Sequence, residues 1–270
     1  MAFIQLLCVT YPKSRQVNYQ KLINLVEIKM TSYPIDTSQR KAARVAGFIF
    51  LLIVIGWILN WIFVESKLTV AGNGTATVNN IMDNELLFRI GITNELIFSI
   101  CGLVLALALY IILKPVNKNL AMLALYWKLT ETIIAAVIVL VTFIALQMLN
   151  GKTYLTVFNP EQLQDIVGLF LNVRSTGATI SMVFLGMNFI LFFYLLFKSN
   201  YVPRLLAGFG ILSYSLILVY SFANILVPQN ATVLSMVNPI SMIFFAPSIL
   251  FEIVMGIWLL FKGIKVLQTN

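Results

Sequence analysis

Histidine is absent from this chain of 270 residues, and charged residues make up only 10% of it. Without histidine, histidine-ligated metal and haem sites are excluded, and so are Ser-His-Asp and Cys-His catalysis. A soluble domain is about a quarter charged, so this chain has too few polar side chains to cover a surface that faces water. We therefore expect lipid to be its main solvent.

Cysteine is also scarce, with only Cys8 and Cys101 in the whole chain. Cys101 lies in the middle of an apolar run, where a free cysteine behaves as a small packing residue. Because a disulfide would require Cys8 to reach the middle of the membrane, we expect none.

Six long apolar runs dominate the rest of the chain. About 20 residues span the hydrocarbon core of a bilayer at about 1.5 Å per residue, and each run is long enough. The runs cover residues 42–64, 90–113, 120–149, 176–197, 205–227 and 240–261. The sequence therefore predicts an all-α fold, a polytopic bundle of six transmembrane helices over residues 40–265.

The distribution of lysine and arginine predicts the orientation of this bundle. Thirteen of the 18 basic residues lie before or at the start of the first run, after the second and fourth runs, and after the sixth. By the positive-inside rule this side is cytoplasmic, so we expect both termini in the cytoplasm and the protein in the cytoplasmic membrane. The net charge is +8, but the basic residues flank apolar runs, so we expect membrane lipids and no nucleic acid as partners.

The connecting segments carry further expectations. The short links 114–118 and 198–204 predict antiparallel neighbours, with Pro115 and Pro203 as helix punctuation. The segment 71–77 has the composition of a flexible loop, and residues 159–170 could form a short interfacial helix before the fourth run.

Two terminal segments lie outside the predicted bundle, residues 1–39 and 266–270, and we expect both to be cytoplasmic. Two interpretations of residues 1–29 stay open: an amphipathic segment, or a start codon placed upstream of the natural one at Met30. The second is favoured because a polar stretch typical of a natural start follows Met30.

Three glutamates lie inside the apolar runs: Glu95, Glu131 and Glu252. An ionised carboxylate in hydrocarbon is costly unless it is paired, hydrated or protonated. Small and polar residues follow them at helical spacing, as Ser99 and Gly102 follow Glu95, and such stripes face other helices. The sequence therefore predicts a polar interior within the bundle.

Three cations are placed where they could offset these carboxylates. By depth, either Arg89 or Arg174 could reach Glu95. Lys128 could pair with Glu131 across one helical turn, or with Glu252 on another helix, and the sequence leaves both choices open. The candidate intramembrane polar site consists of Glu95, Lys128, Glu131, Arg174, Asn188 and Glu252.

Five segments resemble a known family of membrane proteins. They are Arg40-Lys-Ala-Ala-Arg-Val-Ala-Gly-Phe-Ile-Phe50, Leu109-Tyr-Ile-Ile-Leu-Lys-Pro115, Lys128-Leu-Thr-Glu131, Val202-Pro-Arg-Leu-Leu-Ala-Gly208, and Phe251-Glu252 with Trp258-Leu-Leu-Phe-Lys-Gly263. On these segments the chain, from about Arg40 to Lys265, resembles the bacterial and archaeal family called domain of unknown function 4386. The resemblance implies six helices in the cytoplasmic membrane and supplies no activity. Many relatives carry arginine in place of Lys128, so lysine keeps the charge there without the bidentate geometry.

Three kinds of function fit a polar interior of this kind. The first is binding or translocation of a small polar or charged solute, or of a proton, through an intramembrane cavity. The second is a non-catalytic membrane scaffold, or a sensory or accessory subunit, whose buried ion pairs are structural. An enzyme ranks last, because no serine or aspartate catalytic motif and no acidic metal cluster accompanies the glutamates. We therefore predict no catalytic residue, metal or cofactor, and the oligomeric state stays open.

Overall fold

The computed structural model describes residues 36–70, 73–150, 160–227 and 239–265, and in this part of the chain the regular structure is helical. Six of its helices are long and apolar enough to cross a membrane. The predicted fold class, an all-α multi-pass bundle with six spans, is thus confirmed. The N-terminal segment 1–29 and the tail 266–270 lie outside the described residues.

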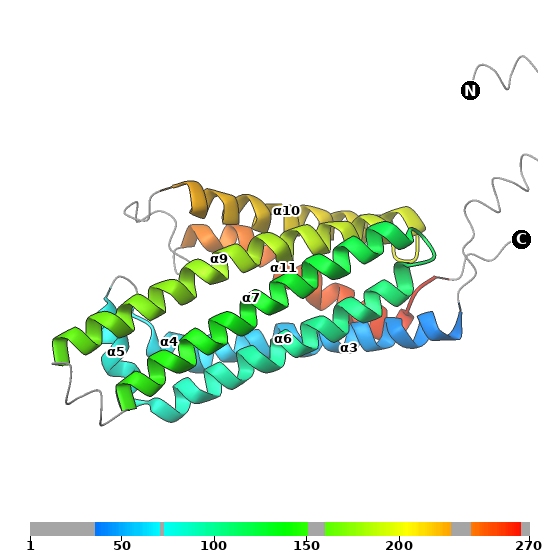
Figure 1. Ribbon diagram of the computed structural model, residues 1–270. Coiled ribbons are helices and arrows are strands. Elements are labelled where there is room, and N and C mark those ends of the chain that lie inside the picture. The colour runs from blue at the N-terminus through cyan, green and yellow to red at the C-terminus, as the bar shows by residue number, and fades with distance from the viewer. Residues whose placement is uncertain (1–35, 71–72, 151–159, 228–238, 266–270) are drawn as a thin grey trace, which may run out of the picture.

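The spanning helices run up and down through the bundle in chain order (Figure 1). They are α3 (Thr37–Asn60), α6 (Glu85–Leu113), α7 (Lys118–Asn150), α9 (Pro160–Ser199), α10 (Arg204–Leu226) and α11 (Pro239–Ile257). A π-helical turn, η1 (Trp61–Glu65), extends α3 into the short α4 (Ser66–Leu68). A second π-helical turn, η3 (Trp258–Lys262), extends α11.

Two connecting segments differ from the expectation. Helix α9 is one continuous helix of 40 residues from Pro160, so its first part is not a separate interfacial helix. Residues 74–77 are not a flexible loop but the start of α5 (Gly74–Asp83). The physical reason is a cap: the Asn73 side chain accepts a hydrogen bond from the Ala76 amide at 2.9 Å, which satisfies a free donor of the first turn.

The six spanning helices form a closed ring in which chain neighbours are also spatial neighbours. Helix α3 packs on α6, α6 on α7, α7 on α9, α9 on α10, and α10 on α11. The ring closes where α11 and η3 pack on α3. At this closure a Cβ atom added to Gly47 would lie 2.4 Å from the backbone nitrogen of Leu260. Glycine therefore lets the two backbones approach closely.

The two ends of the ring differ in charge. One end, the basic end, contains the start of α3, the α6–α7 and α9–α10 links and the end of η3 (Figure 1). Its basic residues are Arg40, Lys41, Arg44, Lys114, Lys118, Lys198, Arg204, Lys262 and Lys265. The opposite end, the far end, contains α4, α5 and the start of α6 and α9, with Lys67 and Arg89 beside Asp83, Glu85 and Asp165. Both ends of the described chain therefore lie at the basic end.

Five aromatic side chains pack together inside the ring toward the basic end. This aromatic layer consists of Phe50, Phe189, Phe193, Tyr214 and Phe251. The ring centroids of Phe189 and Tyr214 lie 4.5 Å apart, and those of Phe193 and Phe251 lie 4.6 Å apart. The core continues toward the basic end with fully buried leucines, so this half of the bundle is tightly filled with apolar side chains.

Candidate functional site

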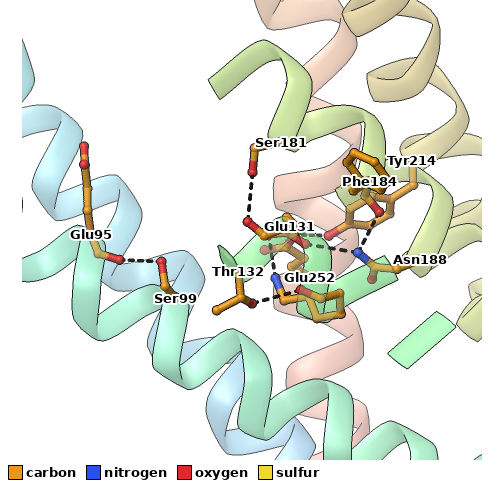
Figure 2. A network of polar contacts seen from close by, with 10 residues as sticks. Glu95, Ser99, Glu131, Thr132, Ser181, Phe184, Asn188, Tyr214 and Glu252 are labelled. Carbon is orange, nitrogen blue, oxygen red and sulfur yellow. Dashed lines mark hydrogen bonds and ion pairs between the residues drawn. The ribbon is translucent and has the colours of Figure 1, made fainter. Parts of the chain in front are cut away.

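A group of polar side chains, the central cluster, lies in the middle of the bundle. It consists of Lys128 and Glu131 on α7, Asn188 on α9, Tyr214 on α10 and Glu252 on α11. Figure 2 shows the side chains of Glu131, Asn188, Tyr214 and Glu252 converging from these four helices. Four of the six spanning helices thus contribute to one polar site.

Direct polar contacts hold the central cluster together. Lys128 Nζ lies 2.6 Å from Glu131 Oε1, and Asn188 Nδ2 donates to the other carboxylate oxygen of Glu131 at 3.1 Å. The Tyr214 hydroxyl donates to Glu252 Oε1. Lys128 is also close enough to Glu252 for electrostatic attraction between them. Tyr214 is likewise within electrostatic range of the Glu131 carboxylate. The two hydrogen-bonded pairs are therefore coupled through their charges.

The sequence builds this cluster from helical spacing and one small residue. Lys128 and Glu131 are three residues apart on α7 and so lie on one face. Gly102 on α6 faces them, and a Cβ atom at this position would lie 2.9 Å from both Cε and Nζ of Lys128. The absence of a side chain at Gly102 thus leaves the space that the ammonium group occupies.

The central cluster lies about half-way through the bundle and is well buried. Lys128 and Tyr214 are each ten residues from the basic end of their helices, which corresponds to about 15 Å, half of the hydrocarbon core. Lys128 is 6% exposed, Asn188 0% and Tyr214 1%. Protein atoms therefore surround most of the surface of these three side chains.

The charges of the central cluster do not balance. With each group in its ordinary ionised form, Glu131 and Glu252 carry two negative charges against the single positive charge of Lys128. Asn188 Oδ1 is buried and has no hydrogen-bond partner among the described residues. The cluster therefore has the capacity to take up one proton or another positive charge. In the same part of the chain no three Cys, Asp or Glu side chains are arranged to hold a metal ion.

A second polar group, the far cluster, lies toward the far end and consists of Glu65, Glu95 and Arg174. Arg174 Nη2 donates to Glu65 Oε1 at 2.8 Å and also to Glu95 Oε1. The Arg174 guanidinium on α9 thereby links α9 to both η1 and α6. As in the central cluster, two carboxylates share one cation.

A small cavity adjoins the far cluster. It leaves about 30 Å³ for the centres of water molecules, and Thr69, Thr77 and Thr142 line it together with Glu65, Glu95 and Arg174. One water needs roughly 10–15 Å³ by this measure, so the cavity has room for a few waters at most. The threonine hydroxyls and carboxylates supply the polar partners that such waters require.

The structure divides the six predicted site residues between these two clusters. Lys128, Glu131, Asn188 and Glu252 meet in the central cluster, whereas Glu95 and Arg174 belong to the far cluster. Figure 2 shows Glu95 apart from the group of Glu131, Asn188 and Glu252. Arg174 is thus the partner of Glu95. The other candidate, Arg89, instead pairs with Glu85 at 2.6 Å, and Lys128 forms its ion pair with Glu131.

Sequence reasoning missed two members of the clusters. Glu65 directly follows the predicted first run, residues 42–64, and the π-helical turn that carries it inward has no clear sequence signature. Tyr214 is absent from the six predicted site residues. The signal for it was present, since Ala207, Tyr214 and Ser221 repeat every seven residues on one buried face of α10.

One family model matches nearly all of the described bundle. No curated protein and no solved structure matches the chain. The family model described as domain of unknown function (DUF4386) matches residues 45–263, which include both clusters and all six spanning helices for most of their length. The chain therefore belongs to the DUF4386 family.

Proposed function

We propose that this multi-pass membrane protein binds a proton at the central cluster and passes it across the cytoplasmic membrane. The observation that carries the proposal is the grouping of two carboxylates and one ammonium at mid-depth, on α7 and α11, with Asn188 of α9 and Tyr214 of α10 bonded to the carboxylates. An unbalanced buried charge is costly, and uptake of one proton removes the imbalance. Carboxylates in such positions are the usual elements of proton relays in membranes.

The packing of the cluster favours a proton over a larger solute. Lys128, Asn188 and Tyr214 are almost completely buried and touch their partners directly. A proton can be transferred along such contacts without opening a volume for a hydrated molecule. Of the small polar or charged species that an intramembrane site could bind, we therefore propose the proton.

Polar groups between the two clusters support access from the far end. Thr142 lines the far cavity and lies on α7, the helix of Glu131. The Ser181 hydroxyl donates to the backbone oxygen of Glu131 at 3.5 Å (Figure 2). In the sequence of α9, Ser181 lies half-way between Arg174 and Asn188. On the other side, the aromatic layer, which begins at Tyr214 of the cluster, continues through Phe193 to buried leucines and forms an apolar barrier of the kind that gates channels.

The orientation follows from the charges at the two ends. The basic end carries most of the positive charge of the described chain, so by the positive-inside rule it faces the cytoplasm. The far cavity then opens toward the outside of the cell. In this conformation the cluster exchanges protons with the external side, and passage to the cytoplasm requires the aromatic layer to separate.

Proton flux into liposomes tests the proposal. The purified full chain is reconstituted with a pH-sensitive dye inside the vesicles, and a pH gradient is imposed across the membrane. We expect acidification faster than in protein-free vesicles, and we expect Glu252→Gln to reduce it to the protein-free rate. Glu252→Gln keeps the shape and the acceptor for Tyr214 but cannot exchange a proton.

Glu85→Gln is the matched control for this measurement. It makes the same chemical change in an ion pair with Arg89 whose side chains are 41% and 38% exposed at the far end. We expect this variant to keep the full flux. Equal flux in the unaltered protein and in Glu252→Gln would contradict the proposal.

A structural role for the buried charges is the second candidate function, that of a membrane scaffold or accessory subunit. It is favoured by one observation: the charged groups of both clusters already have partners within the bundle. A scaffold would give no proton flux above that of protein-free vesicles with the unaltered chain. The liposome measurement therefore separates the two functions.

A further inference from the structure

We propose that a hollow at the basic end binds the phosphate group of an anionic phospholipid. The basic hollow lies between the start of α3 and the end of η3 and has a volume of about 250 Å³. It is lined by Arg40, Arg44, Phe261, Lys262, Gly263 and Ile264. None of these residues belongs to either cluster, so the site is independent of the proposed proton function.

The close contact at Gly47 brings the two walls of the basic hollow together. Toward the basic end from this contact, Arg40 and Arg44 lie one turn apart on α3 and therefore on the same face. On the opposite wall η3 ends at Lys262, and Gly263 turns the chain with a φ of +65°, a value suited to glycine. The chain is then fixed by a hydrogen bond from the Lys265 amide to Tyr201 O at 2.8 Å.

The hollow combines three cationic side chains with no carboxylate in its lining. The buried cations Lys128 and Arg174 contact carboxylates directly, whereas the ion pairs of the described residues do not include Arg40, Arg44 or Lys262. Guanidinium groups bind phosphate oxygens in bidentate fashion, and lysine adds a point charge. A phosphate group is therefore the chemistry that this lining fits.

The positive charge comes from the side chains and not from the amino-terminal end of α3. That end is already capped, because Asp36 accepts a hydrogen bond from the Thr37 amide at 2.6 Å and the Gln39 side chain accepts one from the Asp36 amide at 2.9 Å. The carboxylate of Asp36 is committed to this cap, which leaves the cations of the hollow to recognise an anion.

Apolar surface beside the basic hollow points to a lipid as the source of the phosphate. Phe261, which lines the hollow, is 78% exposed, and Phe48, one turn beyond Arg44 on α3, is 57% exposed. Lys262 lies over the ring of Trp258, with its Nζ 4.4 Å from the ring centroid, a contact typical of the headgroup region. A phospholipid can place its phosphate among the cations and its acyl chains along these exposed rings.

Lipid titration of the purified full chain in detergent tests this site, with bound lipid counted by native mass spectrometry. We expect phosphatidylglycerol to be retained in preference to phosphatidylcholine. The double variant Arg40→Gln/Arg44→Gln should bind phosphatidylglycerol roughly 30-fold more weakly, since each basic residue near a membrane contributes about a factor of five. Lys262→Gln should also weaken the binding of phosphatidylglycerol, and this single variant tests the site if the double variant does not fold.

The control variant is Lys114→Gln/Lys118→Gln, which removes two exposed cations from the same end of the bundle but outside the hollow. We expect it to retain phosphatidylglycerol as the unaltered chain does. Equal loss of lipid in the two double variants would overturn the site in favour of general surface attraction. Saturation by inorganic phosphate at lower concentration than by phosphatidylglycerol would overturn the lipid assignment in favour of free phosphate.

Discussion

At the scale of single residues, each cation inside the bundle serves two carboxylates. Arg174 bonds to Glu65 and Glu95, and Lys128 bonds to Glu131 while it also attracts Glu252. Removing a cation leaves two like charges facing each other in a low-dielectric interior. Removing one carboxylate charge leaves a balanced pair.

This asymmetry predicts opposite consequences for two substitutions in the central cluster. Lys128→Met should lower the thermal midpoint by more than about 5 °C, because a buried pair that loses one partner costs roughly 3–5 kcal/mol. Glu252→Gln should change the midpoint by less than about 2 °C, because Lys128 and Glu131 stay paired and the new amide oxygen can still accept from Tyr214. Unfolding of the detergent-purified variants, followed by intrinsic fluorescence, gives both values.

Lys67→Met controls for the loss of a lysine as such, because Lys67 is exposed at the far end. It should leave the midpoint unchanged. If Glu252→Gln destabilised the protein as strongly as Lys128→Met, the two carboxylates would not share one cation, and the charge imbalance proposed for the central cluster would not exist.

The sequence predicts that the charged residues in the apolar runs lie inside the bundle. It does not predict which of these residues contact each other. Depth along a helix follows from counting residues, so Arg174 was correctly placed within reach of Glu95. Which of two equally deep cations makes the contact depends on the rotation of each helix about its axis. That rotation is set by packing against neighbours and is not encoded in local spacing.

At the scale of elements, the two π-helical turns carry charged residues to positions that a regular helix would not give them. A π-helical turn accommodates one additional residue and rotates everything that follows it. In η1 this rotation directs Glu65 toward Arg174, and in η3 Lys262 follows at the edge of the basic hollow. The sequence predicted both helices but not the shift in register, which explains why Glu65 was missed.

The contact between α3 and the α11–η3 segment gives the element-scale prediction. Gly47→Ala should be destabilising by roughly 1–3 kcal/mol, because its Cβ would lie 2.4 Å from the Leu260 backbone, which cannot rotate away. Gly208→Ala, whose Cβ would meet only Phe197 at 4.0 Å, should be neutral or stabilising, as alanine favours a helix over glycine. Thermal midpoints of the two variants provide the comparison, and equal values would contradict this close contact.

At the scale of the whole molecule, the ring has a polar interior that leads to the far end and an apolar interior at the basic end. The far cluster, the far cavity and Ser181 lie on one side of the central cluster. The aromatic layer begins at Tyr214 of the cluster, and Phe193 and buried leucines such as Leu113 continue it on the other side. Number, order and approximate extent of the spans could be predicted from the sequence, because apolar length alone determines them. This asymmetry of the interior emerges only when six helices pack together.

Labelling of introduced cysteines in cells tests the orientation of the molecule. In a background with Cys8→Ala and Cys101→Ala, Asp83→Cys at the far end should react with a membrane-impermeant maleimide in intact cells. Asn119→Cys at the basic end should react only after permeabilisation, because the proposed orientation places the basic end in the cytoplasm. The reverse pattern would invert the direction of the proposed proton path.

The order of the helices around the ring also determines how the protein is completed during its synthesis. Among the described spanning helices, the extensive interfaces other than that of α3 with α11 and η3 join successive helices, so each can form as soon as the later partner enters the bilayer. The interface between α3 and α11 must wait until nearly the whole chain has been made. Until then Tyr214 lacks its acceptor Glu252, and Gly47 faces lipid instead of Leu260. A nascent chain that stops before α11 is therefore an open ring that lacks one helix and exposes its polar interior, and this is the form that membrane quality control would encounter.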